Sequence, residues 1–349
     1  MVSHPALVGW LFFILNNLYL CAMENIKNEI FGITDNKQFE KVALKIFRDQ
    51  AENIPVYREY VNRLKINVDD VDRLDKIPFL PIQFFKTHEV KPANQKVETI
   101  FTSSGTTGTQ TSRHFVVDAD LYKKSFQASF SKFYGNPSDY CILALLPSYL
   151  ERQGSSLVFM VEELIKQSHH PDSGFFLNEF DALAELIKRM ESKGQKCLLI
   201  GVSFALVDFA DRFKFSLKNT IVMETGGMKG RKKEMIREEL HHYLCEAFGI
   251  QTIHSEYGMT ELFSQAYSNG NGIFQCPPWM KIVIRDPYDP FSTLPAEKVG
   301  AINIIDLANI YSCSFIQTED LGKVYKDESF EVLGRMNDAQ LRGCNLLVY

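Results

Sequence analysis

Short apolar segments and longer helical patterns alternate through the middle of the chain, between residues 140 and 254. Short apolar runs are typical of buried strands, whereas the segments between them repeat apolar residues at helical spacing. The expected strands are Tyr140–Leu146, Gly174–Leu177, Lys196–Gly201, Thr220–Glu224 and Gln251–His254, and the expected helices are Ser156–Gln167, Glu179–Ser192, Phe204–Phe213 and Lys229–Phe248. This alternation predicts an α/β fold in which helices cover a largely parallel sheet.

The flanking segments have other patterns. From Asp35 the apolar residues recur at helical spacing, and Gln38 follows Asp35 at the distance of a capping box. After Gly258 the apolar runs become shorter and are separated by turns, with candidate strands at Met280–Arg285, Gly300–Asp306, Cys313–Gln317 and Phe330–Leu333. We therefore expect one domain at residues 23–349, made of a helical N-terminal region (23–95), an α/β core (96–260) and a β-rich part (261–349).

Composition excludes several classes of protein. A length of 349 residues, 45% hydrophobic residues and 27 Phe are sufficient for a large core. A formal charge of −5 gives no basic field, so nucleic acid is not an expected partner. The seven cysteines contain no C-x-x-C pair, which is typical of reduced thiols and predicts a cytoplasmic protein.

The N-terminus contains an apolar stretch at Leu7–Cys21. No Lys or Arg precedes it, Asn16 and Asn17 interrupt it, and it is too short for a hydrocarbon layer of ~30 Å. Met23 begins a more polar segment that resembles an ordinary start of a soluble protein. We expect residues 1–22 to be a misassigned start or a non-core leader, and no membrane span in the mature protein, with a true anchor as the alternative.

The segment Phe101–Ser112 is rich in Ser, Thr and Gly. Glycine lets the backbone approach a ligand closely, and free N–H groups and hydroxyls can hold anionic oxygens. Neither Gly105 nor Gly108 is followed by the lysine of an ordinary P-loop, so the usual kinase or GTPase loop is excluded. Two interpretations stay open for this segment alone, a phosphate-binding loop and a solvated surface turn.

Two further segments follow expected strands of the core. In Glu224–Gly230, Gly226 and Gly227 would let a flat ring stack on bare backbone, although a tight turn would also use them. In His254–Glu261, Tyr257 could cover an adenine face and the carboxylate of Glu261 could hold Mg²⁺.

Two more segments lie in the β-rich part. Thr318–Gly322 contains Asp320, whose carboxylate could accept both hydroxyls of a ribose. Gly334–Gly343 contains Arg335, which could contact ribose or phosphate, and Asp338, where the chain could bend. Each segment alone is a weak signal.

In this order the segments resemble the superfamily of enzymes that form acyl- and aryl-adenylates. Its members carry a Ser/Thr/Gly loop, a Tyr-Gly-x-Thr-Glu segment, a Thr-Gly-Asp-like segment and a Gly-Arg-x-x-Asp hinge, although Glu319 stands here where glycine is usual. The resemblance implies the N-terminal-domain fold of adenylate-forming enzymes. It implies contacts to ATP or AMP from Thr102, Ser103, Ser104, Gly105, Thr106, Thr107, Gly108, Gly226, Gly227, Tyr257, Gly258, Met259, Thr260, Asp320 and Arg335.

A closer resemblance is to the LuxE-like acyl-protein synthetases of bacterial luminescence. It is carried by Leu146–Leu157, Thr225–Gly230 and Leu341–Leu346. It implies an AMP-forming acid–thiol ligase that uses ATP and Mg²⁺, held by Glu261, to activate a fatty acid. Cys344 would then accept the acyl group as a thioester.

The implied partners are an acyl-reductase, an acyltransferase or a carrier protein. The chain ends at Tyr349, so the mobile C-terminal domain of ordinary superfamily members is not expected. Two alternatives stay open: an acyl-CoA ligase in which coenzyme A is the acceptor, and a catalytically silent nucleotide-binding or scaffold protein. His254 would line an acyl pocket or be a core histidine.

Overall fold

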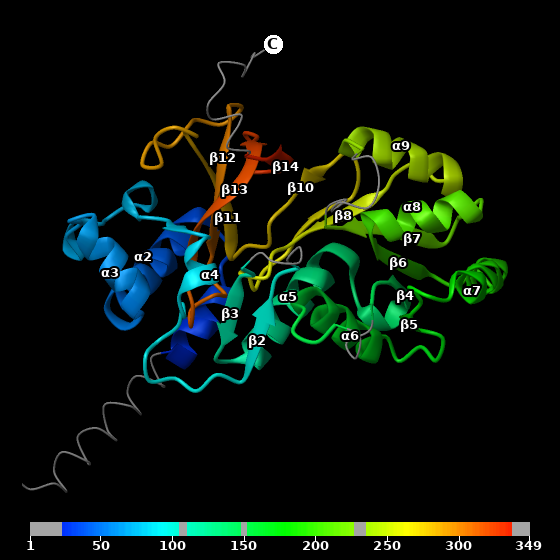
Figure 1. Cartoon of the computed structure of the whole chain (residues 1–349), viewed down its shortest axis with the longest axis horizontal. Helices are drawn as coiled ribbons and strands as arrows, with labels where there is room; N and C mark the ends of the chain where they lie inside the picture. Colours follow the sequence, from blue (N-terminus) through cyan, green and yellow to red (C-terminus); the bar gives the residue numbers. More distant parts are fainter. Residues whose placement is uncertain (1–22, 105–109, 148–151, 227–234, 337–349) are drawn as a thin grey trace, which may run out of the picture.

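The computed structural model describes residues 23–104, 110–147, 152–226 and 235–336 (Figure 1). The expectation for residues 1–22 and the predicted acceptor Cys344 both lie outside these ranges. Within them, no helix is long and apolar enough to cross a membrane.

Helical segments form the N-terminal region, as the sequence predicts. Residues 23–31 are helical, and the elements that follow are α2 (Asn36–Asn53), α3 (Pro55–Arg63), η1 (Val68–Asp70), η2 (Leu74–Lys76), β1 (Leu80–Pro81) and α4 (Phe84–Thr87). Helix α2 begins where its cap predicts, because Asp35 Oδ1 accepts the backbone N–H of Gln38 at 2.9 Å. The Gln38 side chain accepts from the N–H of Thr34 at 3.0 Å rather than from the cap residue itself.

The core contains a six-stranded sheet of order β5-β4-β6-β7-β8-β9, parallel except for β9. Its strands are β4 (Cys141–Leu145), β5 (Gly174–Phe175), β6 (Cys197–Val202), β7 (Thr220–Thr225), β8 (His254–Tyr257) and β9 (Ala266–Ser268). The helices are α5 (Ala119–Tyr134), α6 (Ser156–Ser168), α7 (Phe180–Ser192), α8 (Ser203–Arg212) and α9 (Arg237–Phe248), and η3 (Pro137–Asp139) precedes β4. The predicted α/β fold is confirmed.

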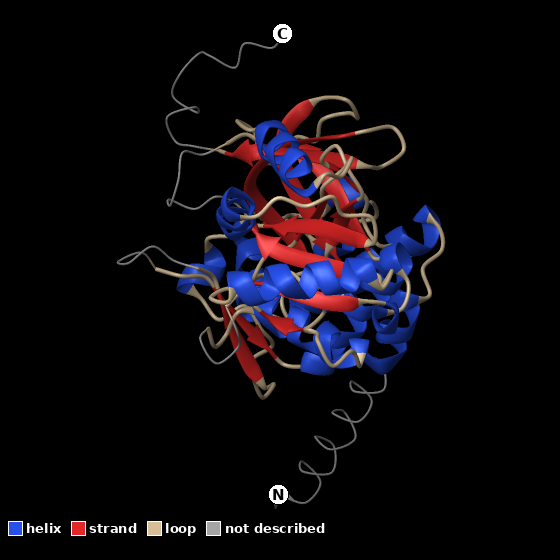
Figure 2. Cartoon of the chain, turned by 90° about the vertical axis from the view of Figure 1, so that its right-hand side faces the viewer, coloured by secondary structure: helices blue, strands red, loops and turns tan. Residues whose placement is uncertain are grey.

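Helices lie on both sides of this sheet (Figure 2). Successive side chains of a strand point to opposite faces, so each strand contributes to two apolar layers. Ile142 and Ala144 of β4 belong to one buried cluster with α5 and α6, whereas Leu143 and Leu145 belong to another with α7, α8 and α9. This double coverage explains why the strand sequences are apolar without alternation.

One strand prediction in the core is shifted. The expected strand Gln251–His254 ends where β8 begins, because the residues that pair with β7 are polar rather than apolar. Ser255 and Glu256 are buried and satisfied by neighbours. Ile253, which favours a strand in the sequence pattern, is buried just before β8.

A second six-stranded sheet forms the β-rich part, with order β10-β14-β13-β12-β11 and β1 parallel to β13. Its strands are β10 (Ile273–Phe274), β11 (Met280–Arg285), β12 (Val299–Asp306), β13 (Phe315–Val324) and β14 (Phe330–Arg335). A separate hairpin pairs β2 (Thr99–Thr102) with β3 (Arg113–Val116). Strand β13 is longer than predicted, so Asp320 lies within a strand and not in a turn.

Candidate active site

The Ser/Thr/Gly segment connects the two strands of the β2–β3 hairpin. At its base the backbone N–H of Ser103 donates to the Ser112 carbonyl at 3.1 Å, and the Ser112 N–H donates to Ser103 Oγ at 3.0 Å. The Thr102 N–H donates to the Gly154 carbonyl at 2.7 Å, which ties the hairpin to the start of α6. The predicted phosphate contacts Gly105, Thr106, Thr107 and Gly108 lie outside the described residues, whereas Ser104 follows directly on this closed base.

Tyr257, Asp320 and Arg335 come together although they lie in three distant segments of the sequence. The Tyr257 hydroxyl donates to Asp320 Oδ2 at 2.8 Å, and Arg335 Nε lies 3.7 Å from Asp320 Oδ1. Asp320 and Arg335 are register partners on β13 and β14, so the ladder itself sets their spacing. Burial raises the pKa of the Asp320 carboxyl, while the hydrogen bond from Tyr257 and the charge of Arg335 oppose this rise.

Glu261, four residues after Tyr257 in the same motif, is a buried carboxylate with 4% of its surface exposed. Burial raises its pKa, whereas a hydrogen bond from Ser112 and the charges of Arg335 and Lys86 favour the ionised form. Its backbone carbonyl accepts from Asn309 Nδ2 at 2.8 Å. The side chain of Glu261 is therefore tied to Ser112, next to the Ser/Thr/Gly segment, and lies within electrostatic range of Arg335.

The described residues of the site offer one carboxylate to magnesium, that of Glu261. No group of three or more His, Cys, Asp and Glu side chains that could hold a metal occurs among the described residues. Mg²⁺ does not require such a cage, because it is commonly held by one or two carboxylates together with substrate phosphates and water. Glu261 supplies one such carboxylate beside the hairpin base.

Sequence reasoning missed His114, which links the β2–β3 hairpin to the segment His254–Glu261. His114 on β3 is fully buried, and its Nδ1 lies 2.9 Å from the Thr260 carbonyl. Burial lowers the pKa of His114 to about 4, so the ring is neutral at pH 7 and Nδ1 carries the donated proton. A lone histidine after a polar loop carries no sequence signal that would have revealed this contact.

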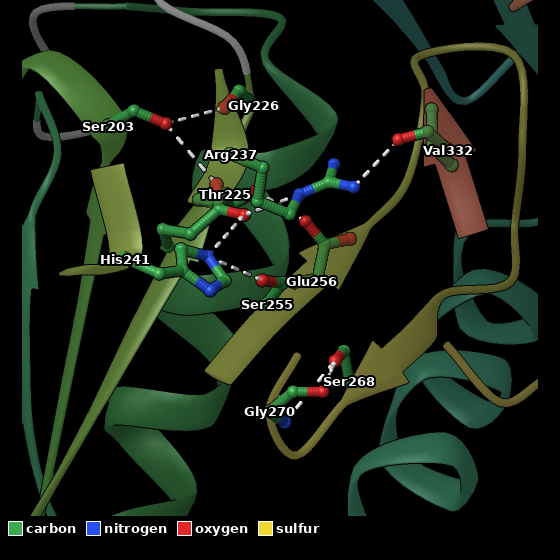
Figure 3. A network of polar contacts seen from close by, with 11 residues as sticks. Ser203, Thr225, Gly226, Arg237, His241, Ser255, Glu256, Ser268, Gly270 and Val332 are labelled. Atoms are coloured by element: carbon green, nitrogen blue, oxygen red, sulfur yellow. Dashed lines mark hydrogen bonds and ion pairs between the residues drawn. The ribbon is translucent and has the colours of Figure 1, made fainter. Parts of the chain in front are cut away.

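The two glycine segments lie at the carboxyl ends of neighbouring parallel strands. Gly226 follows β7 with φ of 72°, a conformation that glycine adopts without strain, and Gly227 lies outside the described residues. Gly258 follows β8, where a Cβ atom would meet Glu256 Oε1, so a larger residue would have to displace that carboxylate. The Thr225 hydroxyl donates to Glu256 Oε2 and joins the two strand ends (Figure 3).

His254 lies apart from these groups, at the start of β8. Its Nδ1 is 3.2 Å from the Tyr134 hydroxyl, and burial lowers its pKa. Tyr267 packs against Tyr134 in the same aromatic cluster, with ring centroids 5.3 Å apart. A cavity of about 430 Å³ lies elsewhere, between Phe79 and Phe291 among others, and none of the predicted site residues lines it. The role predicted for His254 in an acyl pocket stays a prediction.

Residues 32–349 match the family model described as acyl-protein synthetase, LuxE. The chain belongs to this family. It is 34% identical over 70 residues to the long-chain-fatty-acid–luciferin-component ligase of Photorhabdus luminescens, a match that covers 20% of this chain and 60% of that relative.

Solved structures show that this LuxE-family chain has the fold of adenylate-forming enzymes. ATP-bound MatB from Rhodopseudomonas palustris has a TM-score of 0.54 at 17% identity, covering 69% of this chain and 48% of that one. An open conformation of 2-hydroxyisobutyryl-CoA ligase, in complex with 2-HIB-AMP and CoA, has a TM-score of 0.65 at 13% identity. The match covers 88% of this chain and 77% of that one. The fold class predicted from the sequence motifs is confirmed.

The Tyr257–Asp320 contact of this LuxE-family chain is open to a direct test. Tyr257→Phe removes the hydroxyl that donates to a mostly buried carboxylate, so we expect the free energy of unfolding to fall by about 1–2 kcal/mol. Urea denaturation measures the change. Tyr267→Phe is the control, because the buried Tyr267 hydroxyl has no partner among the described residues and its loss should cost nothing. Equal effects of both substitutions would contradict the prediction.

Glu256 predicts a pH dependence of stability in this family member. Burial raises the pKa of Glu256 to about 7, above the ordinary glutamate value of 4.5, and Glu224 adds to the rise. The folded state therefore binds this proton more tightly than the unfolded chain. The resulting stabilisation is fully present below pH 4.5 and is lost as the pH rises through about 7.

Glu256→Gln removes this titration and keeps an oxygen to accept from Thr225. We expect the free energy of unfolding of the variant, relative to the parent, to increase by about 2–3 kcal/mol between about pH 5 and pH 8. Urea denaturation at a series of pH values measures it. Glu185→Gln is the control, since that carboxylate is 74% exposed on α7. A difference independent of pH would show that Glu256 is ionised throughout.

Proposed function

We propose that this chain activates a carboxylic acid, in particular a fatty acid, as an acyl-adenylate at the expense of ATP. One observation carries the proposal: Tyr257, Asp320 and Arg335, from three separate motifs, meet within hydrogen-bond or ion-pair distance. Glu261 accepts a hydrogen bond from Ser112, next to the Ser/Thr/Gly segment, and the positive charge of Arg335 favours its ionised form. The family supports this function, and the fold neighbours support the arrangement of the motifs.

The proposed nucleotide contacts follow from the chemistry of each group. Adenine would lie between Tyr257 and the backbone of Gly226 and Gly227. The two ribose hydroxyls would donate to Asp320, whose carboxylate keeps lone pairs free beyond the one used by Tyr257. Arg335 would keep that carboxylate ionised and contact ribose. The β- and γ-phosphates would bind hydroxyls and N–H groups of Thr102–Gly108.

In the proposed first step, an oxygen of the substrate carboxylate attacks the α-phosphorus of ATP. A new P–O bond forms, the bond to the bridging oxygen breaks, and pyrophosphate leaves with the electron pair. Mg²⁺, held by Glu261 and the phosphates, would supply positive charge against the charge that builds up. The buried position of Glu261 keeps this carboxylate away from bulk water and strengthens its electrostatic effect.

In the proposed second step, the Cys344 thiol loses its proton and the sulfur attacks the acyl carbonyl carbon. The bond from that carbon to the phosphate oxygen breaks, AMP leaves, and an acyl-protein thioester remains. Such a thioester suits delivery to an acyl-reductase, an acyltransferase or a carrier protein. Acyl transfer to coenzyme A is the rival route.

Acid-dependent exchange of labelled pyrophosphate into ATP tests the proposed function. The purified chain is incubated with ATP, Mg²⁺ and saturated carboxylic acids of increasing chain length. We expect exchange that requires the acid and has an optimum among fatty acids. Nucleotide binding without exchange for any acid would favour a catalytically silent nucleotide-binding protein and overturn the proposal.

A further inference from the structure

Two buried carboxylates lie beneath the strand ends that carry the glycine segments. Glu224 on β7 is 5% exposed and Glu256 on β8 is 7% exposed. Ser203 Oγ donates to the Gly226 carbonyl at 2.8 Å (Figure 3). The same hydroxyl lies 3.2 Å from Glu224 Oε2, so Glu224 and the Gly226 turn share it. Buried carboxylates are costly unless a positive group compensates them.

Arg237, at the start of α9, is a positive group beside Glu224. Its Nε lies 3.7 Å from Glu224 Oε1. Its Nη1 donates to the Val332 carbonyl at 2.8 Å (Figure 3). His241, one turn further along the helix, approaches the same Glu224 oxygen at 3.6 Å. Arg237 therefore contacts the parallel sheet through Glu224 and the second sheet through β14.

Arg237 also packs against Phe274, which in turn contacts Tyr257. Its guanidinium lies 5.2 Å from the centroid of the Phe274 ring, and that ring lies 5.9 Å from the ring of Tyr257. Gly272 leaves room for the arginine stem, because a Cβ atom there would come within 2.9 Å of Arg237 Cδ. A lysine could not reach all three partners, because its ammonium is a single point and not a planar fork.

We propose that Arg237 is a positioning residue of the nucleotide site: it sets the distance between the Thr225–Gly226 turn and strand β14, which carries Arg335. The inference rests on the proposed function, since it assumes that the Thr225–Gly226 turn and strand β14 bind the same nucleotide. Arg237 acts through Glu224, Val332 and Phe274, and contacts no reacting atom in this role. Because Arg237 contacts no reacting atom, its loss should weaken the binding of ATP in the ground state and the transition state alike, which raises KM more than it lowers kcat.

The test compares Arg237→Met and Arg237→Lys with Arg212→Met. Arg212 is the matched control because it also pairs with a carboxylate, Asp181 at 3.3 Å, and lies over aromatic rings, but at the end of α8. We expect Arg237→Met to raise KM for ATP about tenfold with a much smaller change in kcat. Arg237→Lys should lie in between, and Arg212→Met should leave KM unchanged.

A second comparison separates positioning from a general loss of stability. Glu224→Gln removes the charge that Arg237 compensates, so the double variant with Arg237→Met should show a smaller rise in KM than the two single effects combined. Thermal unfolding establishes which variants are folded. If Arg237→Met does not fold, Arg237→Lys and Glu224→Gln are used for the KM measurement instead. An unchanged KM for ATP in folded Arg237 variants, or an equal rise in Arg212→Met, overturns the inference.

The inference and the proposed function can fail separately. If the parent chain exchanges pyrophosphate but the Arg237 variants keep its KM, the function stands and the inference falls. If no acid supports exchange, titration with a fluorescent ATP analogue decides: weaker binding by Arg237→Met than by the parent supports the inference. Equal binding, or no binding by the parent chain, overturns it.

Discussion

Glu261→Gln is expected to lower the rate of acid-dependent pyrophosphate exchange by about 10²–10³-fold, as for loss of one preorganised transition-state contact. The amide has the shape of the carboxylate and still accepts from Ser112, so the fold should be unchanged. What is lost is the negative charge that would hold Mg²⁺ against the phosphates. Steady-state exchange at several Mg²⁺ concentrations measures the effect, and the Mg²⁺ requirement should rise.

Glu319→Gln is the matched control for this variant. Glu319 lies next to Asp320 on β13, but its carboxylate is directed to Gln83, whose Nε2 donates to it at 2.6 Å. Loss of this charge should change the exchange rate less than about threefold, as is usual for a surface carboxylate away from reacting groups. If Glu261→Gln retained the parent rate, the proposed role of Glu261 would be wrong.

Cys344→Ser is expected to abolish covalent labelling of the chain by a radioactive fatty acid while exchange continues at the parent rate. The serine hydroxyl is a much weaker nucleophile than a thiolate, so the adenylate would form but would not be discharged onto the protein. Labelling is measured after denaturation, and neutral hydroxylamine should release the label from the parent chain as from a thioester.

Cys245→Ser is the control for that labelling experiment. Cys245 is a partly exposed free cysteine on α9, so it tests whether any accessible thiol becomes labelled. We expect this variant to label like the parent. Unimpaired formation of acyl-CoA by Cys344→Ser, with no covalent label in the parent chain, would instead assign coenzyme A as the acceptor.

The sequence predicts the parallel sheet well because burial on two faces leaves a simple pattern. Strand β11 has the predicted bounds, Met280–Arg285, and β4 and β6 differ from their predictions by at most one residue at each end. The β2–β3 hairpin was not predicted, since its strands are short and flank a polar loop. The Ser, Thr and Gly residues of Phe101–Ser112 indicate a ligand-binding loop, but they do not indicate that the residues on either side pair as strands.

The candidate site was predictable only where a motif recurs in a family. Tyr257, Glu261, Asp320 and Arg335 were selected in this way. The structure brings Tyr257, Asp320 and Arg335 together through the pairing of β13 with β14 and the hydrogen bond from the end of β8. His114 and Arg237 were missed, because each acts by a contact to a distant backbone carbonyl. Such contacts depend on tertiary packing and leave no local pattern in the sequence.

The central claim, that the carboxylate oxygen attacks the α-phosphorus, is tested most directly by following that oxygen. The purified chain is incubated with ATP and a fatty acid whose carboxylate carries the heavy isotope of oxygen, and the released nucleotide is analysed by mass spectrometry. Adenylation predicts that one heavy oxygen appears in AMP, together with unlabelled pyrophosphate. Heavy oxygen in inorganic phosphate, released together with ADP, would show attack at the γ-phosphorus and contradict the claim.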